Sequence, residues 1–294
     1  MQKFTFLIAI LLYCIIAANG QNDTLYFMKG ESIINRQSIK QIDLDSIKFS
    51  NSDTITFVKN NLIVNKQSIK PTDIDSIIFY KPIIGSSNTI TDYDGNVYNT
   101  VTIGTQIWMK ENLKTTHYAN GVAIPLVSGS SNWDALTSAN EAYCWHSDDI
   151  ANKATYGALY TWAAAMKAGL SSTYNPSGVQ GVCPTGWHLP SDAEWTQLTD
   201  FLGGTTASVV KLKSTTGWYN GGNGTNESGF TAYPAGVRNS SGLFNYIGIN
   251  SRWWCATETN SIMALDRLMG YNLNDLESYS VDKTFGYSVR CLKD

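Results

Sequence analysis

The chain carries an internal duplication near its amino terminus. Residues 24–49 and 54–79 align without a gap at an offset of 30 residues, and 14 of the 26 aligned positions are identical. Each copy is rich in Ile, Phe and Thr and is interrupted by Gly, Asn and Asp, which predicts two or three short strands. One copy is too small to bury its apolar face alone, so we expect the two to pack on each other as a small β spacer.

Residues 1–20 have the pattern of a secretory signal peptide. Lys3 is followed by a largely apolar run, and small residues at its end predict cleavage before Gln21. Cys14 offers a lipoprotein alternative, which a bulky tyrosine directly before it disfavours. No later segment approaches the roughly 20 apolar residues that a membrane-spanning helix needs. We therefore expect an exported protein that is extracellular, periplasmic or on the cell surface.

The composition excludes two classes of protein. Charged residues make up 15% and aromatic residues 12% of the chain, a balance that disordered proteins do not have. The formal net charge is -3, so the chain lacks the excess of basic residues that nucleic-acid binding needs. The segment 81–89 is rich in Pro, Gly and Ser, which predicts a linker between the duplicated spacer, 21–80, and a main domain, 90–294. All nine tryptophans lie in this main domain.

The main domain combines signals for helices and for strands. Apolar residues recur at helical spacing over 155–168, and Gly169 predicts the end of that helix. A second helix is expected to begin at Ser191, which can form a capping box with Glu194 and is followed by apolar residues up to Gly203. Hairpins are predicted at Asp94-Gly95 and at Gly104, and brief strands near 229–232, 253–257 and 287–292. This order of elements favours an α+β, loop-rich domain.

The cysteines of the mature chain indicate disulfide chemistry. They are Cys144, Cys183, Cys255 and Cys291. An even number in an exported protein predicts up to two disulfides, and the spacing alone leaves three pairings open. Free buried thiols are the alternative. The chain contains no CxxC motif that would indicate a zinc knuckle or a redox-active pair.

Five stretches of the main domain carry a family resemblance. They are DYDGNVYNTVTIGTQIWMKENLKT from Asp92, AYCWHSDD around Cys144, YGALYTWAAAM from Tyr156, GVCPTGWHLPSDAEWTQL from Gly181 and GYSVRCLKD, which ends at Asp294. On these stretches the domain resembles the Fibrobacter succinogenes major paralogous domain, a family common in exported bacterial proteins. GWHLPSDAEW is also similar to a segment of the formylglycine-generating, sulfatase-modifying family.

The second resemblance implies a C-type-lectin-like fold with short twisted sheets, two helices and long irregular loops. In such folds a disulfide ties an early helical region to the last strand. By position Cys183 and Cys291 would form that disulfide, which leaves Cys144 and Cys255 for each other if they bond at all. The late cysteines do not match the catalytic pair of the sulfatase-modifying enzymes, so the resemblance implies no activity here.

The sequence offers no enzymatic motif. It contains no nucleophile elbow, HExxH, Walker loop or dinucleotide fingerprint. His117, His146 and His188 lie in three separate motifs, and we expect a structural role for His188. The segment 92–96 places its glycine fourth and not sixth as an EF-hand requires, which favours a hairpin turn, and 146–149 is interpreted as a solvated turn or helix cap. No catalytic residue, metal or cofactor is therefore predicted.

A binding role is the favoured interpretation. The segment 214–260 places many aromatic residues among Gly, Asn, Ser and Thr, and flat aromatic faces with amide and hydroxyl neighbours suit sugar rings or partner proteins. The ligand-binding candidates are Trp218, Tyr219, Tyr246 and Trp253, with core packing as the alternative for each, while Arg252 and Glu258 are expected in an ion pair or as loop anchors. A cryptic enzyme on a formylglycine-generating-like fold and a purely structural surface protein are the competing interpretations.

Overall fold

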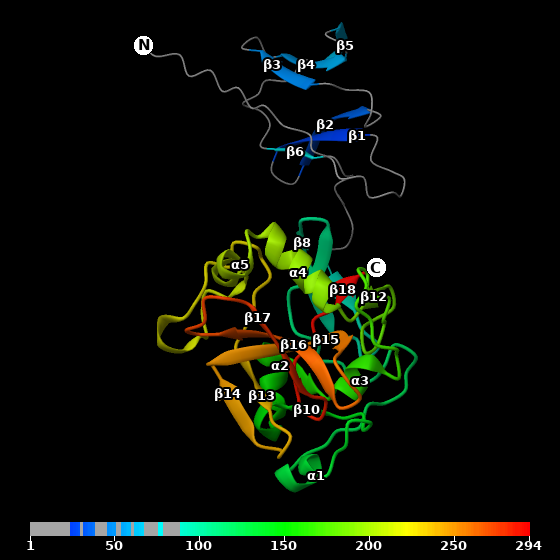
Figure 1. Cartoon of the computed structure of the whole chain (residues 1–294), viewed down its shortest axis with the longest axis vertical. Helices are drawn as coiled ribbons and strands as arrows, with labels where there is room; N and C mark the ends of the chain where they lie inside the picture. Colours follow the sequence, from blue (N-terminus) through cyan, green and yellow to red (C-terminus); the bar gives the residue numbers. More distant parts are fainter. Residues whose placement is uncertain are drawn as a thin grey trace. The chain divides into compact units, whose positions relative to one another are not determined.

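A computed structural model describes residues 89–294 and, within the duplicated segment, the backbone of six strands between residues 24 and 78 (Figure 1). The predicted signal peptide with Cys14 lies outside the described residues, as does the linker up to residue 88. Contacts within the chain group it into two units, Met1–Ser86 and Ser87–Asp294. The boundary between the units falls within the range predicted as a linker.

Each copy of the duplication supplies three strands. The first copy forms β1 (Thr24–Lys29), β2 (Ser32–Ser38) and β3 (Ser46–Ser50), and the second forms β4 (Thr54–Lys59), β5 (Leu62–Gln67) and β6 (Ser76–Ile78). They make two antiparallel sheets with the strand orders β2-β1-β6 and β3-β4-β5. Each sheet therefore contains a hairpin from one copy and a third strand from the other.

The strands that the two copies exchange pair at equivalent positions of the repeat. Phe27 pairs with Ile77 across β1 and β6, and the equivalent Phe57 pairs with Ile47 across β4 and β3. Both hairpins also shift register at the same place, directly after Phe27 and after Phe57. The two copies are thus interlocked by backbone pairing, because neither provides three adjacent strands for a sheet of its own.

The first sheet of the main domain joins its two ends. Its strands are β7 (Thr89–Thr91), β8 (Val97–Ile103), β9 (Gln106–Met109), β12 (Trp187–His188) and β18 (Leu292–Lys293), in the order β12-β18-β9-β8-β7. The predicted hairpins at Gly95 and Gly104 are confirmed. Both glycines have positive φ angles, 78° and 62°, in the left-handed region that favours glycine.

The second sheet crosses the middle of the domain (Figure 1). It contains β13 (Ala235–Arg238), β14 (Phe244–Ile247), β15 (Asn250–Glu258), β16 (Met263–Gly270) and β17 (Glu277–Asp282), in the order β14-β13-β15-β16-β17. A separate hairpin pairs β10 (Tyr143–Trp145) with β11 (Ala158–Tyr160). The strand predicted at 253–257 lies within β15, whereas 229–232 makes only an isolated bridge, Lys213 to Ala232. The domain is α+β.

The helix predicted over 155–168 is wrong. The chain there forms α2 (Lys153–Tyr156), then β11, then α3 (Trp162–Met166). Gly157 breaks the helix with a φ of 75°, and a Cβ at this position would stand 2.7 Å from the Leu113 carbonyl oxygen. The apolar residues have helical spacing, but residues 158–160 form a strand because their backbone hydrogen bonds are made with β10.

The capping box is confirmed at the start of α4 (Asp192–Phe201). The Glu194 amide donates to Ser191 Oγ at 3.3 Å, and the Ser191 amide donates to Glu194 Oε2 at 2.9 Å. Directly after Gly203 and Gly204 the chain forms α5 (Thr205–Leu212), a helix that the sequence analysis does not predict. Figure 1 shows α4 and α5 together at one end of the main domain and α1 (Ser130–Asp134) at the other.

Aromatic side chains fill the core beneath α4. Trp108, Trp195, Trp253 and Phe230 are fully buried, with ring centroids 4.8 Å apart for Trp108 and Trp195 and 5.7 Å apart for Trp195 and Trp253. Large rings suit a domain with short elements, because each buries much apolar area while its polar edge can bond to loop backbone.

Candidate functional site

A cavity of about 250 Å³ opens between α5, the segment 219–223 and the loop that follows β16. Apolar and polar side chains share its wall. The lining residues are Thr206, Val209, Val210, Lys213, Gly222, Asn223, Tyr271, Leu273 and Asn274. Two neighbouring segments, α5 and 219–223, thus meet the loop after β16, some fifty residues later in the chain, around one small space that we call the α5 cavity.

Backbone hydrogen bonds hold the walls of the α5 cavity in place. The Trp218 amide donates to Asn223 Oδ1 at 3.0 Å, and the Tyr219 amide donates to the Gly248 carbonyl at 2.7 Å. Gly222 approaches the backbone of Tyr271 so closely that a Cβ would overlap it. The segment 219–223 is therefore fixed against the loop after β16, and the cavity is preformed.

Lys213 is the cationic residue of this wall. It follows the last residue of α5, its amide completes the helix by donating to the Val209 carbonyl, and only 4% of its surface is exposed. Its Nζ donates to the Tyr271 carbonyl at 3.3 Å and lies 4.9 Å from the centre of the Trp218 ring. Within residues 89–294 it makes no ion pair. Burial lowers the pKa of this amine to about 8, because desolvation disfavours its charged form.

Two tyrosines give the site an aromatic edge. Tyr271 lines the cavity, and Tyr219 packs against it edge to face with the ring centroids 5.4 Å apart. Tyr219 is 60% exposed, so one aromatic ring is presented to solvent beside the cavity. A perturbed amine next to a preformed pocket with convergent polar groups is a physical criterion for a binding site.

The structure separates the four predicted ligand-binding residues. Tyr219 lies beside the cavity, and Tyr246 is 54% exposed on β14 but does not line it. The prediction is wrong for Trp218 and Trp253 as surface contacts, because both rings are buried in the core. Their indole N–H groups are also satisfied inside, by the Ala232 carbonyl and by Asn112 Oδ1.

Sequence reasoning missed Lys213 and Tyr271. A lysine at the end of a helix is common because it complements the helix dipole, so its type and position gave no sign of burial. The available signal was the apolar spacing of Val209 and Leu212, which marks the buried face of α5. Tyr271 gave no local signal, because the segment that faces it lies some fifty residues earlier in the chain.

The family comparison covers the part of the chain that contains this cavity. The model of the Fibrobacter succinogenes major domain matches residues 101–293, which is more than half of the chain. The chain belongs to this family. No match was found among curated proteins or among solved structures. Among the described residues, no helix has the length and apolar character that crossing a membrane requires.

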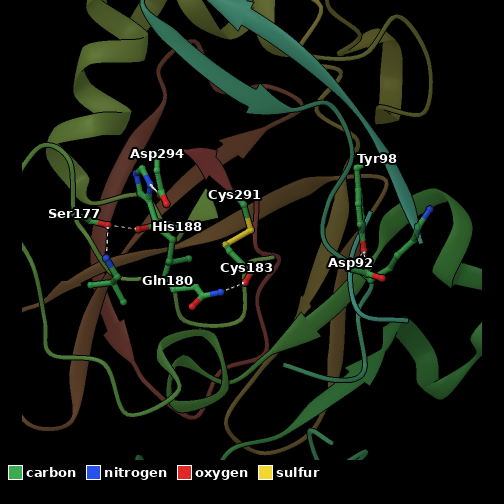
Figure 2. The surroundings of a disulfide bond; sticks show 11 residues. Asp92, Tyr98, Ser177, Gln180, Cys183, His188, Cys291 and Asp294 are labelled. Atoms are coloured by element: carbon green, nitrogen blue, oxygen red, sulfur yellow. Dashed lines mark hydrogen bonds and ion pairs between the residues drawn. A yellow bond between two sulfur atoms is a disulfide. The ribbon is translucent and has the colours of Figure 1, made fainter. Parts of the chain in front are cut away.

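One disulfide of this Fibrobacter succinogenes major domain is confirmed. Cys183 and Cys291 are bonded, which ties the segment before β12 to the segment before β18 (Figure 2). The second pairing is wrong: Cys144 and Cys255 are free, and each is buried in a different apolar cluster. Desolvation raises the pKa of the Cys144 thiol to about 12, so this thiol is inert at neutral pH.

His188 has the structural role that was expected. Its Nε2 lies 2.8 Å from Glu194 Oε1. Its Nδ1 lies 2.7 Å from Oδ1 of Asp294, which is beside it in Figure 2. Burial lowers the pKa of this imidazole, but the two carboxylates outweigh burial and raise the pKa above 6.5. Because both ring nitrogens are engaged, His188 fastens the carboxyl-terminal residue to α4 and has no nitrogen left for a metal.

The remaining polar candidates also bind other parts of the fold. Asp94, in the confirmed hairpin turn, contacts His117 Nδ1 at 2.5 Å. Asp149 accepts from the Ala151 amide at the start of a 3-10 turn, which confirms the helix-cap interpretation. His146 is buried against Phe244, with ring centroids 5.1 Å apart. In residues 89–294, no three His, Cys, Asp or Glu side chains gather into a metal site.

Arg252 and Glu258 each form an ion pair, but not with each other. Arg252 Nη1 lies 2.6 Å from Asp266 Oδ2, and Lys283 Nζ lies 2.5 Å from Glu258 Oε2. The expectation of an anchoring role is confirmed, with partners on neighbouring strands and turns that the sequence does not reveal.

Proposed function

We propose that this chain is a non-enzymatic binding module whose α5 cavity holds a sugar ring. The observation that carries the proposal is the cavity itself. Its volume of about 250 Å³ lies just below the roughly 300–1,000 Å³ of pockets for drug-sized ligands, which suits a single ring. The walls are preformed, so binding costs little ordering of the protein.

The chemistry of the wall matches the two sides of a sugar. Sugars present an apolar C–H face and a rim of hydroxyls, and they need a flat apolar surface with donors and acceptors around it. Tyr219 and Tyr271 supply the aromatic surface beside the cavity. The Nδ2 group of Asn223 can donate, the Asn274 amide can donate and accept, and the Thr206 hydroxyl, whose proton goes to Asp275, can accept.

The residues that line the α5 cavity also favour a binding module over an enzyme. The residues that line the α5 cavity include no carboxylate, imidazole or thiol that could pair with Lys213 for acid–base catalysis. His188 is committed to two carboxylates elsewhere. The competing proposal of a cryptic enzyme lacks an acid–base pair at this cavity.

The proposal also includes a C-type-lectin-like arrangement and an exported location. The disulfide between Cys183 and Cys291 supports both. It joins a segment shortly before α4 to the final strand region, as in lectin-like folds, and disulfides persist mainly in oxidising compartments outside the cytosol.

A glycan-binding screen with the full mature chain tests the proposal. Binding found in the screen is then measured by calorimetry for wild type, Tyr219→Ala and Tyr246→Ala, which remove two tyrosines of similar exposure. We expect Tyr219→Ala to weaken binding about fivefold and Tyr246→Ala to leave it unchanged, since stacked aromatic rings contribute on the order of 1 kcal/mol. Loss of binding in Tyr246→Ala alone would move the site to β14. A folded chain that binds no glycan would overturn the proposal in favour of a protein partner.

A further inference from the structure

We propose that the ligand of the α5 cavity carries a carboxylate and that the ammonium of Lys213 binds it. This inference rests on the proposed saccharide function and narrows the ligand class to acidic sugars such as uronic acids. It starts from the way in which the domain treats its other buried cations.

Most buried cations of the domain have a carboxylate partner. Arg238 pairs with Asp148, Arg267 with Asp192 and Lys283 with Glu258. This pattern is expected, because a buried charge without a partner costs several kcal/mol. These three buried cations are therefore neutralised by carboxylates of the same domain.

Two buried cations depart from this pattern. Arg290 has no carboxylate, but its guanidinium bonds to Asn112 Oδ1 and to the Phe230 carbonyl and is stacked on the Phe230 ring. The Lys213 ammonium lies over the Trp218 ring and has one hydrogen bond, to the Tyr271 carbonyl, although an ammonium carries three donors. Of these two residues, only Lys213 lines the cavity.

The charged groups around Lys213 leave it without a counter-ion. On α5, Lys211 turns to the Leu202 carbonyl at 3.2 Å. The segment 219–223 contains no ionisable group except the Tyr219 phenol. In the loop after β16, exposed Asp275 accepts from the hydroxyls of Thr205 and Thr206 at 3.1 and 2.5 Å. No carboxylate of residues 89–294 lies within ion-pair distance of Lys213, so a carboxylate on the ligand would supply the missing partner.

The geometry suits a carboxylate attached to a sugar ring. A lysine ammonium acts as a compact point charge and can donate two further charge-assisted hydrogen bonds to one carboxylate. The amides of Asn223 and Asn274 then remain for the ring hydroxyls. A neutral sugar in the same place would cover the ammonium without neutralising it, and its binding would be weaker for that reason.

The inference predicts a specific dependence on pH. Desolvation lowers the pKa of Lys213 to about 8, so the amine is charged below this pH and neutral above it. Affinity for a uronate is expected to fall as the pH rises through 8, by about thirtyfold between pH 6.5 and pH 9.5 if only the charged amine binds. Affinity for an uncharged sugar should change little over this range.

The experiment uses calorimetry with the full mature chain and pairs of ligands that differ only in charge. Glucuronate, galacturonate and mannuronate are each compared with their uncharged methyl ester. The variants are Lys213→Met and the matched control Lys211→Met, since both lysines belong to the end of α5. We expect at least one uronate to bind about tenfold tighter than its ester to wild type and to Lys211→Met, with this preference lost in Lys213→Met.

The outcomes separate the two proposals. Equal affinity for each acid and its ester would overturn the carboxylate inference while the saccharide function stands. No binding of any acid or ester would overturn the carboxylate inference, and the neutral glycans of the screen then decide the saccharide function. Lactate that binds through Lys213 while no sugar binds would support a carboxylate site and overturn the saccharide function. If Lys213→Met does not fold, the pH dependence of wild type decides: no loss of uronate affinity above pH 8 would contradict the role of Lys213.

Discussion

Removal of the Cys183–Cys291 cross-link should strongly destabilise the main domain without changing its charge. The bond closes a loop of 108 residues. In the chain-entropy account, a loop of this length restricts the unfolded chain by about 16 cal/mol/K, or about 5 kcal/mol at 25 °C. Because about 1 kcal/mol shifts the melting temperature of a domain of this size by roughly 2–4 °C, we expect a fall of about 10–20 °C.

The assay is urea unfolding followed by tryptophan fluorescence. All nine tryptophans lie in the main domain, so the signal reports that domain and not the duplicated spacer. The variant is Cys183→Ala with Cys291→Ala. The matched control is Cys144→Ala with Cys255→Ala, which also removes two fully buried sulfur atoms but no cross-link.

The difference between the two double variants isolates the cross-link from the loss of packing. We expect the disulfide variant to be less stable than the control by about 2–5 kcal/mol, the range measured when native disulfides are removed. A difference below about 1 kcal/mol would refute the reasoning, because it would mean that residual structure already restricts the unfolded chain between Cys183 and Cys291 without the bond.

Three further changes test the packing around the site and the termini. His188→Gln should lower the free energy of unfolding more at pH 6 than at pH 9. The pKa of His188 is raised in the folded state, so its ion pairs stabilise the fold fully below about pH 6.5 and stop doing so once the pH exceeds the pKa of the folded state. Equal losses in urea titrations at both pH values would argue against a charged imidazole. Arg238→Met should cost about 1–3 kcal/mol in the same assay, since it removes the buried guanidinium that donates to the Val127 and Gly242 carbonyls, and a change near zero would contradict this. Gly222→Ala should lower the melting temperature by overlap with the Tyr271 backbone, at a cost of about 1–3 kcal/mol, and an unchanged melting curve would show that the segment 219–223 is free to move.

Local patterns were sufficient for several elements. The start of α4 follows from Ser191 and Glu194 alone, because the two capping bonds join residues three apart in the chain. The turns at Gly95 and Gly104 follow from the freedom of glycine at positive φ. The duplication predicts equivalent strands in both copies, and the register shift that follows both Phe27 and Phe57 agrees with it.

The family resemblance reached further than local patterns could. It identified the major domain that matches residues 101–293. The second resemblance, to the formylglycine-generating family, selected the pairing of Cys183 with Cys291 from three possibilities that spacing left open. It could not show that Cys144 and Cys255 stay apart, because that depends on which apolar cluster each thiol enters.

By itself the sequence determined the duplication, the family and the elements whose stabilising contacts are short-range. The tertiary structure decided the rest, because burial and cavities are made by segments that are remote in the chain. Gly157 ends a predicted helix where residues 158–160 meet β10, and Trp218 becomes core beneath Lys213. The α5 cavity exists only where α5, 219–223 and the loop at Tyr271 converge, so no local pattern could mark the lysine that lines it.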